Sequence, residues 1–196
     1  MPRLSPSLVA ALVLAVAVST ASAQVFDCIT FGDLPSAGGA ERLEDAAGYA
    51  TAALCDGQYL AVHQGDRLEV YAVAPDARPE YVASVEDLGG FANRYRPAAI
   101  GSYLYLAQDP GLVYDLSNDG YPLLATTLTG SYTAFATRDT LLAGATHAET
   151  ILFGCSDPAA PVPVGTIPQH GRLEFTGGLL GVMGAEGKGV QHQRAI

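Results

Sequence analysis

Three of the four histidines stand in polar turns that also carry carboxylates. Imidazole nitrogens and carboxylate oxygens together form a plausible ligand set for a divalent metal ion. The candidate metal ligands are His63, His147, His170, Asp66, Asp109 and Glu149. No two of these histidines have the tight sequence spacing of a metal motif. A shared site therefore depends on the elements that carry these turns.

Those elements recur along the chain. Residues 57–85, 101–128 and 139–167 share one layout of turn, apolar strand, polar turn, second strand, a turn with proline and a last strand. The first bulky residue of each copy is Tyr59, Tyr103, Leu141 and Leu179, at steps of 44, 38 and 38 residues. A period near 40 with several short strands per repeat is typical of the blades of a β-propeller. The sequence therefore predicts an all-β, propeller-like fold.

Alternation of apolar and polar residues predicts four strands in each complete blade. The blades are expected at about residues 48–85, 96–128 and 132–167, with a partial fourth at 171–196. The expected strands are residues 49–55, 59–63, 67–73 and 80–85; 96–100, 103–108, 112–116 and 122–127; and 132–137, 141–145, 150–155 and 162–167. The predicted buried core is Leu60, Val62, Leu68, Val70, Leu104, Leu106, Val113, Leu142, Ile151, Phe153 and Val164.

The fourth copy is incomplete. Its proline is expected 20 residues after Leu179, but Ile196 is the last residue of the sequence. Residues 189–194 make a poor third strand by their composition. Two arrangements remain open: an open arc that is part of a larger propeller, or a small four-bladed ring closed by the strand VFDCITF at residues 25–31. An unpaired strand edge favours aggregation, which argues for closure or a partner.

The repeat also resembles a known family. The patterns G-x-Y-L-x-(V/L)-A, L-x-V-Y-(D/A)-(V/L)-(S/A) and P-x-x-(V/L)-A-(S/T) are similar to the LVIVD repeat of bacterial and archaeal surface proteins. The similarity is clearest in GSYLYLAQDPGLVYDLSNDGYPLLATTL, at residues 101–128. It implies an exported, propeller-like protein, usually with no assigned activity. The repeat residues are structural, so the resemblance carries no functional site.

Residues 1–23 read as a secretory signal peptide. Arg3 precedes an apolar run at residues 8–18, and small residues ending in Ala21-Ser22-Ala23 form a cleavage site. The apolar run is too short to span a bilayer, which needs about 20 residues. The predicted mature protein is one domain, residues 24–196, that is secreted, periplasmic or at the cell surface and has no transmembrane segment.

Three cysteines follow the predicted signal, namely Cys28, Cys55 and Cys155. An oxidising compartment would allow one disulfide and leave one thiol. Cys155 occupies the strand position of Val73 and Leu116 in the other copies, so we expect it to be a buried, inert side chain. Cys28 with Cys55 is the first pairing to test, and connectivity stays open.

Other motifs carry no chemistry. The glycine-rich stretch 181–189 has the wrong spacing for a phosphate-binding loop. The segment that begins at Asp115 resembles the first half of a calcium loop, but Thr126 stands where the bidentate glutamate belongs, which favours a structural turn. The formal net charge of −10 argues against nucleic acid as a partner.

Two functions fit this sequence. The first is a non-enzymatic binding or surface-scaffold module that contacts a protein or a glycan. It requires the fold, the signal and the acidic surface, and no cofactor. The second is a metal-dependent, hydrolase-like enzyme with its site on one propeller face. In a blade, the turn between the second and third strands emerges on the same face as the link to the next blade, so the polar turns described above would share that face.

Overall fold

The computed structural model describes residues 51–74, 77–89, 96–176, 179–183 and 190–194, in which every regular element is a β-strand. The predicted signal peptide, VFDCITF and Cys28 lie outside these residues. No helix among the described residues has the length and apolar character needed to cross a membrane.

The strands form four antiparallel sheets, here called blades 1 to 4, and each sheet follows sequence order. Blade 1 contains β1 (Thr51–Cys55), β2 (Tyr59–Gln64), β3 (Arg67–Ala72) and β4 (Glu80–Val85). Blade 2 contains β5 (Ala98–Ile100), β6 (Tyr103–Leu106), β7 (Gly111–Asp115) and β8 (Leu123–Leu128). Blade 3 contains β9 (Ala134–Arg138), β10 (Leu141–Ala145), β11 (Thr150–Gly154) and β12 (Val162–Ile167). Blade 4 contains β13 (Arg172–Thr176), β14 (Leu179–Met183) and β15 (Val190–Arg194).

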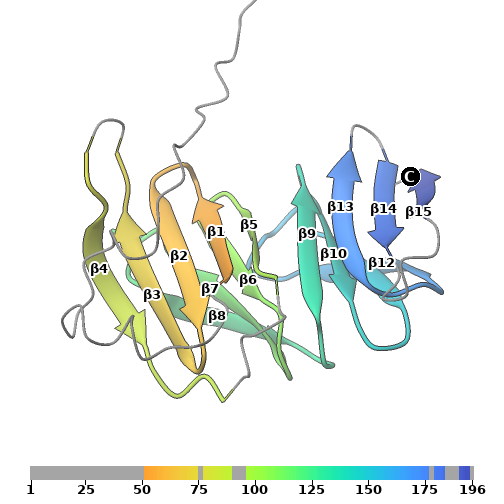
Figure 1. The fold of residues 1–196 in the computed structure, drawn as a ribbon, viewed down its shortest axis with the longest axis horizontal. Coiled ribbons are helices and arrows are strands. Elements are labelled where there is room, and N and C mark those ends of the chain that lie inside the picture. The colour runs from red at the N-terminus through yellow and green to blue at the C-terminus, as the bar shows by residue number, and fades with distance from the viewer. Residues whose placement is uncertain (1–50, 75–76, 90–95, 177–178, 184–189, 195–196) are drawn as a thin grey trace, which may run out of the picture.

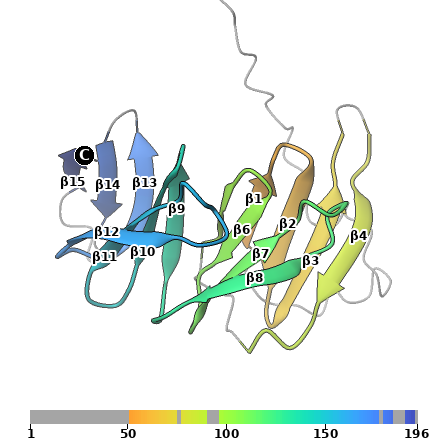
Figure 2. The ribbon, with the colours of Figure 1, turned by 180° about the vertical axis from the view of Figure 1, so that it is seen from behind.

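The first strand of every blade lies on the inside of an arc. β1 packs beside β5, β5 beside β9, and β9 beside β13. A parallel bridge between Arg96 and Ala134 joins the start of blade 2 to blade 3. Within the described residues the blades form an open arc, with blade 1 and blade 4 at its two ends (Figure 1). β8 and β12, the last strands of blades 2 and 3, cross the back of the molecule (Figure 2).

Equivalent hydrogen bonds confirm the predicted repeat. After the third strand, the backbone N–H of Val73, Leu116 and Cys155 donates to a carbonyl before the second strand of the same blade. The acceptors are Gln58, Ser102 and Thr140, at 2.8, 3.0 and 2.7 Å respectively. The predicted strands of the three complete blades are confirmed, with ends that differ by no more than two residues. The repeated sequence thus specifies one repeated backbone unit.

Each complete blade also has a bulge between its third and fourth strands. The register shifts between Val70 and Tyr71, between Val113 and Tyr114, and between Leu152 and Phe153. The fourth strand supplies the extra residue, which is Val82, Ala125 or Val164. An extra residue disrupts strict alternation and bends the strand. The inward and outward pattern expected from sequence therefore fails along the outer strands.

The core lies between the blades. Leu68, Val70, Leu104 and Leu106 are fully buried between blades 1 and 2. Aromatic side chains dominate the cluster between blades 2 and 3, which contains Tyr105, Tyr132, Phe135 and Phe153. Smaller residues fill the space between blades 3 and 4, namely Ala143, Ala145, Leu173, Leu180 and Val182. Neighbouring blades therefore hold each other by burial of apolar surface.

Most of the predicted core is confirmed. Eight of the predicted residues are buried: Val62, Leu68, Val70, Leu104, Leu106, Val113, Leu142 and Phe153. Leu60 and Ile151 are only half-buried. The prediction for Val164 is wrong, because its side chain is 64% exposed. Val164 is the extra residue of the bulge on an outer strand, and no blade covers it from outside.

Blade 4 differs from the prediction in one respect. Residues 189–194 look like a poor strand by sequence, yet β15 pairs with β14 in regular antiparallel register from Leu179–Arg194 to Met183–Val190. Backbone pairing with a neighbouring strand therefore outweighs the weak intrinsic preference of that segment. Among the described residues, blade 4 has three strands where the other blades have four.

Candidate functional site

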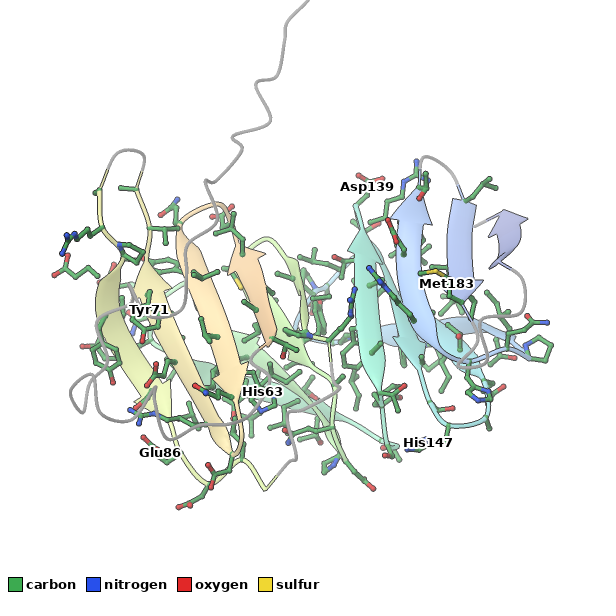
Figure 3. All side chains as sticks on the ribbon, in the orientation of Figure 1. His63, Tyr71, Glu86, Asp139, His147 and Met183 are labelled. Carbon is green, nitrogen blue, oxygen red and sulfur yellow. The ribbon has the colours of Figure 1, made fainter. Side chains whose placement is uncertain are left out.

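Two of the predicted metal ligands, His63 and His147, lie toward the same side of the molecule. Figure 3 shows His63, Glu86 and His147 along the lower edge, whereas Asp139, in the turn between β9 and β10, lies at the upper edge. His63 lies near the end of β2 in blade 1, and His147 lies in the turn between β10 and β11 of blade 3. The two histidines are therefore well apart along that edge.

His63 is an interior residue and does not project from a turn. Its side chain is 1% exposed. Alternation along β2 places it on the same side as Ala61, which packs in the cluster between blades 1 and 2. Burial lowers the pKa of His63 below its ordinary value, because the charged imidazolium loses hydration. A neutral imidazole at this position fills the interface between the two blades.

Hydrogen bonds near His63 fix the backbone of the link that leads from blade 1 to blade 2. The Leu88 N–H donates to the carbonyl of Asp66 at 2.8 Å, which ties the link after β4 to the turn between β2 and β3. The Gln108 side chain, 4% exposed, donates from Nε2 to the Leu88 carbonyl at 3.2 Å. These contacts join blade 1 to blade 2.

The remaining candidates are spread over three turns and a link. Asp66, Asp109, His147 and His170 are exposed, and Glu149 is half-buried. The backbone of Glu149 closes a tight turn in which its N–H donates to Thr146 Oγ1 at 3.1 Å. Among the described residues, no three His, Cys, Asp or Glu side chains form a group that could hold a metal ion. The metal site stays a prediction, and the structure brings together no ligand group for it.

The segment at Asp115 is a structural turn, as predicted. Its Oδ1 accepts a hydrogen bond from the Ser117 N–H at 2.8 Å, and the Gly120 N–H donates to the Leu116 carbonyl. Burial acts to raise the pKa of Asp115, but hydrogen bonds from Ser117, Tyr103 and Ser102 outweigh it and lower that pKa. The carboxylate is therefore used by its own turn.

The structure instead shows an apolar surface on the outside of the arc. Of the six large apolar side chains that are exposed in the described residues, five lie on or beside β8 and β12. We call them the outer-strand patch: Tyr121, Leu123, Leu124, Val162 and Val164, each 53–64% exposed. The sequences LLATTL of β8 and VPVGTI of β12 contain no charged residue.

A groove of about 410 Å³ adjoins the outer-strand patch. We call it the blade 2–3 groove. Its walls come from the end of β8 and the following turn on one side, and from β11 and β12 on the other. The lining residues are Thr127, Leu128, Thr129, Tyr132, Ile151, Phe153, Pro161, Pro163 and Thr166. Patch and groove together form an apolar surface that spans two blades.

A second groove lies on the inside of the arc, and we call it the axial groove. Its volume is about 350 Å³, and all four blades contribute to it. The lining residues are Thr51 and Ala52 of β1, Arg96 and Pro97 before β5, Phe135 of β9, and Leu173 of β13. Arg96 is the only charged residue among them.

Both surfaces were missed by sequence reasoning. The outer strands could have been noticed, because a strand edge that faces solvent usually carries charge and these two carry none. The sequence around Arg96 gives no such signal. Arg96 lies in the axial groove because β1, β9 and β13, which are distant in sequence, come together around it.

Comparison with known proteins identifies the architecture. Neither a family model nor a curated protein matches the sequence. Among solved structures, Hsv2 of Kluyvelomyces marxianus is similar over 75% of this chain, with a TM-score of 0.52 and 14% identity. The N-terminal domain of Nup159 is similar over 73%, with a TM-score of 0.50 and 8% identity. Both are β-propellers. The fold is that of a β-propeller.

At these identities the similarity shows the fold alone. The matched regions span 48% of the Hsv2 chain and 42% of the Nup159 chain, so this chain covers less than half of either structure. The propeller prediction is confirmed, and the open-arc alternative describes the part of the chain that the structure shows. The resemblance to the LVIVD repeat stays a prediction.

Proposed function

We propose that this protein is an exported, non-enzymatic binding module that docks a protein partner on the outer-strand patch. The observation that carries the proposal is the exposure of Leu123, Leu124, Val162 and Val164, at 55–64%, on two outer strands. Several exposed large apolar side chains on neighbouring strands are typical of interaction sites in soluble proteins. The groove beside it supplies depth for an anchoring side chain.

The outer strands also have backbone groups that could form hydrogen bonds with a partner. β8 and β12 are the last strands of their sheets, so each has one edge without a strand beside it in the described residues. An extended peptide can add to such an edge by main-chain hydrogen bonds, while pockets beside the edge select its side chains. Natural proteins usually protect open edges with charged residues or proline. β12 contains Pro163, whereas β8 contains neither charge nor proline, which supports use of the β8 edge by a partner.

The chemistry of the surface favours a protein over a glycan. Five of the nine residues that line the blade 2–3 groove are leucine, isoleucine, phenylalanine or proline, and leucine and valine make up most of the outer-strand patch. A glycan presents many hydroxyl groups, which need hydrogen-bonding side chains in return. Export is supported by residues 1–23 and by the resemblance of residues 101–128 to a repeat of surface proteins.

The proposal is tested with a library of random peptides displayed on phage and selected on the mature protein. We expect enrichment of peptides that alternate apolar and polar residues. Val164→Lys should weaken their binding by about tenfold or more, because a lysine would bring charge into the apolar contact. Ala148→Lys is the matched control, since Ala148 is exposed on the turn between β10 and β11.

Thermal unfolding checks that both lysine variants fold as the unmodified protein does. Failure to enrich any peptide would contradict the proposal. So would peptides whose binding is the same in Val164→Lys and Ala148→Lys.

A further inference from the structure

We propose that the axial groove binds the carboxylate group of a small, partly apolar ligand through Arg96 and Thr51. This site lies on the inside of the arc, whereas the outer-strand patch lies on its outside. The inference does not rest on the protein-docking function, and the two are tested with different variants.

The groove has the dimensions of a ligand site. Its volume of about 350 Å³ falls within the range of small-molecule pockets, about 300–1,000 Å³. Its walls come from β1, β9, β13 and the segment before β5, so its shape is fixed by the packing of all four blades. Phe135 and Leu173, which are 3% and 4% exposed, are among its apolar lining residues.

Arg96 is exposed and supplies a positive charge that forms no ion pair among the described residues. Its carbonyl accepts a hydrogen bond from the Phe135 N–H at 2.9 Å, and it bridges to Ala134, so its backbone is held in place. The ion pairs of the described residues involve Arg67 and Arg138, and none involves Arg96. A guanidinium matches the planar geometry of a carboxylate by two parallel hydrogen bonds.

Thr51 adds a neutral donor to the lining of the same groove. Its hydroxyl oxygen is buried and has no hydrogen-bond partner among the described residues. Buried polar atoms are nearly always hydrogen-bonded in folded proteins, and rotation of the Thr51 side chain toward the groove would give this hydroxyl a partner in a bound ligand. A hydroxyl can donate to the second lone pairs of the carboxylate that Arg96 holds.

The charge of the whole chain narrows the ligand class. With 20 acidic and 10 basic residues, the field of the protein opposes multiply charged anions such as phosphate esters. One arginine neutralises one negative charge, and Ala52, Pro97, Phe135 and Leu173 in the lining allow contact with a small apolar group on the ligand. A monocarboxylate fits these conditions, either as a free acid or as the C-terminus of a peptide.

Isothermal titration calorimetry with defined probes tests the site. The probes are isovalerate as a free acid, the dipeptide acetyl-Ala-Leu as a peptide C-terminus, and acetyl-Ala-Leu amide, which lacks the carboxylate. We expect at least one of the two acids to bind with a Kd of about 1 mM or tighter, and the amide not to bind. Binding of isovalerate alone identifies a free acid as the ligand source, and binding of the dipeptide alone identifies a peptide terminus.

Three variants then assign the residues. Arg96→Gln should weaken binding of the acid by about tenfold or more, and Thr51→Val by a smaller factor of about threefold. Arg78→Gln is the matched control, because Arg78 is exposed in the turn between β3 and β4 and lies outside the lining of the groove. Thermal unfolding should be unchanged in all three.

The site is overturned if neither acid binds, if the amide binds as well as the acid, or if Arg96→Gln binds the acid as the unmodified protein does. Unchanged binding in Thr51→Val would show that the Thr51 hydroxyl does not contact the ligand.

Discussion

The hydroxyl group of Tyr105 in β6 of blade 2 donates a hydrogen bond to the backbone carbonyl of Pro158, in the turn between β11 and β12 of blade 3, at 2.9 Å. Tyr105 is fully buried, and its ring stacks edge-on against Phe135 of blade 3. One side chain thus links two blades both by apolar contact and by a polar anchor.

Tyr105→Phe should lower the free energy of unfolding by about 0.5–1.5 kcal/mol, because the ring keeps its packing while the Pro158 carbonyl loses its donor. Urea unfolding followed by circular dichroism measures the change. Tyr121→Phe, at a residue that is 53% exposed, is the control and should be neutral. Equal stability of Tyr105→Phe and the unmodified protein would show that the bond contributes nothing.

Gly144 of β10 is held at glycine by the aromatic cluster. A Cβ at this position would lie 2.7 Å from Phe135 and 2.9 Å from Tyr132. Gly144→Ala should therefore destabilise by about 1–3 kcal/mol through overpacking. Gly165→Ala, in β12 of the same blade, is the matched control, since its added Cβ would meet nothing within 4 Å. A stability loss of the same size in both variants would contradict this explanation.

Leu104 tests the packing between blades 1 and 2. Its side chain is fully buried, so Leu104→Ala should cost about 2–5 kcal/mol of unfolding free energy. Leu124→Ala removes the same atoms from a side chain that is 55% exposed and should cost far less. The difference between the two, measured as urea midpoints, reports burial alone. Similar losses would be inconsistent with this register of the blades.

The sequence predicted the inner part of each blade better than the outer part. β6 (YLYL) and β10 (LLAGA) contain no polar side chain, and Leu104, Leu106 and Leu142 are buried as expected. On β12 the bulge inserts Val164, and the alternation that predicted its burial no longer applies. A bulge arises from the way in which two strands pair. The periodicity of one strand alone therefore cannot predict which residue lies in the bulge.

The candidate site was harder to predict for a similar reason. The rule that certain turns share a face placed His63 and His147 along the same edge, as Figure 3 shows. It did not reveal that His63 points between blades, because that depends on the two-residue alternation of β2 continuing through its last residues. Arg96 gains its place from β1, β9 and β13 together, and no local pattern indicates their convergence.

His63 should make stability depend on pH. Burial lowers its pKa in the folded protein, whereas the unfolded chain keeps the ordinary value of 6.5. Below about pH 6.5 the unfolded state therefore binds more protons than the folded state. The stability that the neutral His63 contributes is fully present above that pH, and it is lost as the pH falls toward the pKa of His63 in the folded protein. His63→Phe has no group that titrates at this position, so it should lack this part of the pH dependence of stability.

Urea unfolding of both proteins at several pH values between about 8 and 5 provides the measurement. The unmodified protein should lose more stability than His63→Phe as the pH falls. If the two curves stay parallel over this range, the histidine is not responsible.

The thiols of Cys55 and Cys155 should resist modification in the folded protein. Both are fully buried and free among the described residues. Burial, with a smaller effect of Asp56, raises the pKa of Cys55 to about 12, and burial also raises that of Cys155. Since the thiolate is the reactive form, both should react slowly with Ellman's reagent near pH 8.

A Cys28→Ser variant isolates these two residues. Slow reaction should become rapid in denaturant, and rapid labelling of the folded variant would contradict their burial. The unmodified protein in denaturant then tests for a disulfide: three reactive thiols indicate its absence, and one indicates its presence, in which case identification of the labelled cysteine as Cys155 supports the Cys28–Cys55 pair.

Because each blade is built from one continuous stretch of chain, with its strands in sequence order, almost all backbone pairing joins residues that are close along the chain. Such local pairing requires only short loops to close, which favours fast assembly of each unit. Cohesion between units comes from nearest neighbours, as in other repeat proteins. Within the described arc, blades 2 and 3 have a neighbour on both sides and blades 1 and 4 have one. Amide hydrogens of the two end blades should therefore exchange with solvent through openings that leave the middle pair intact.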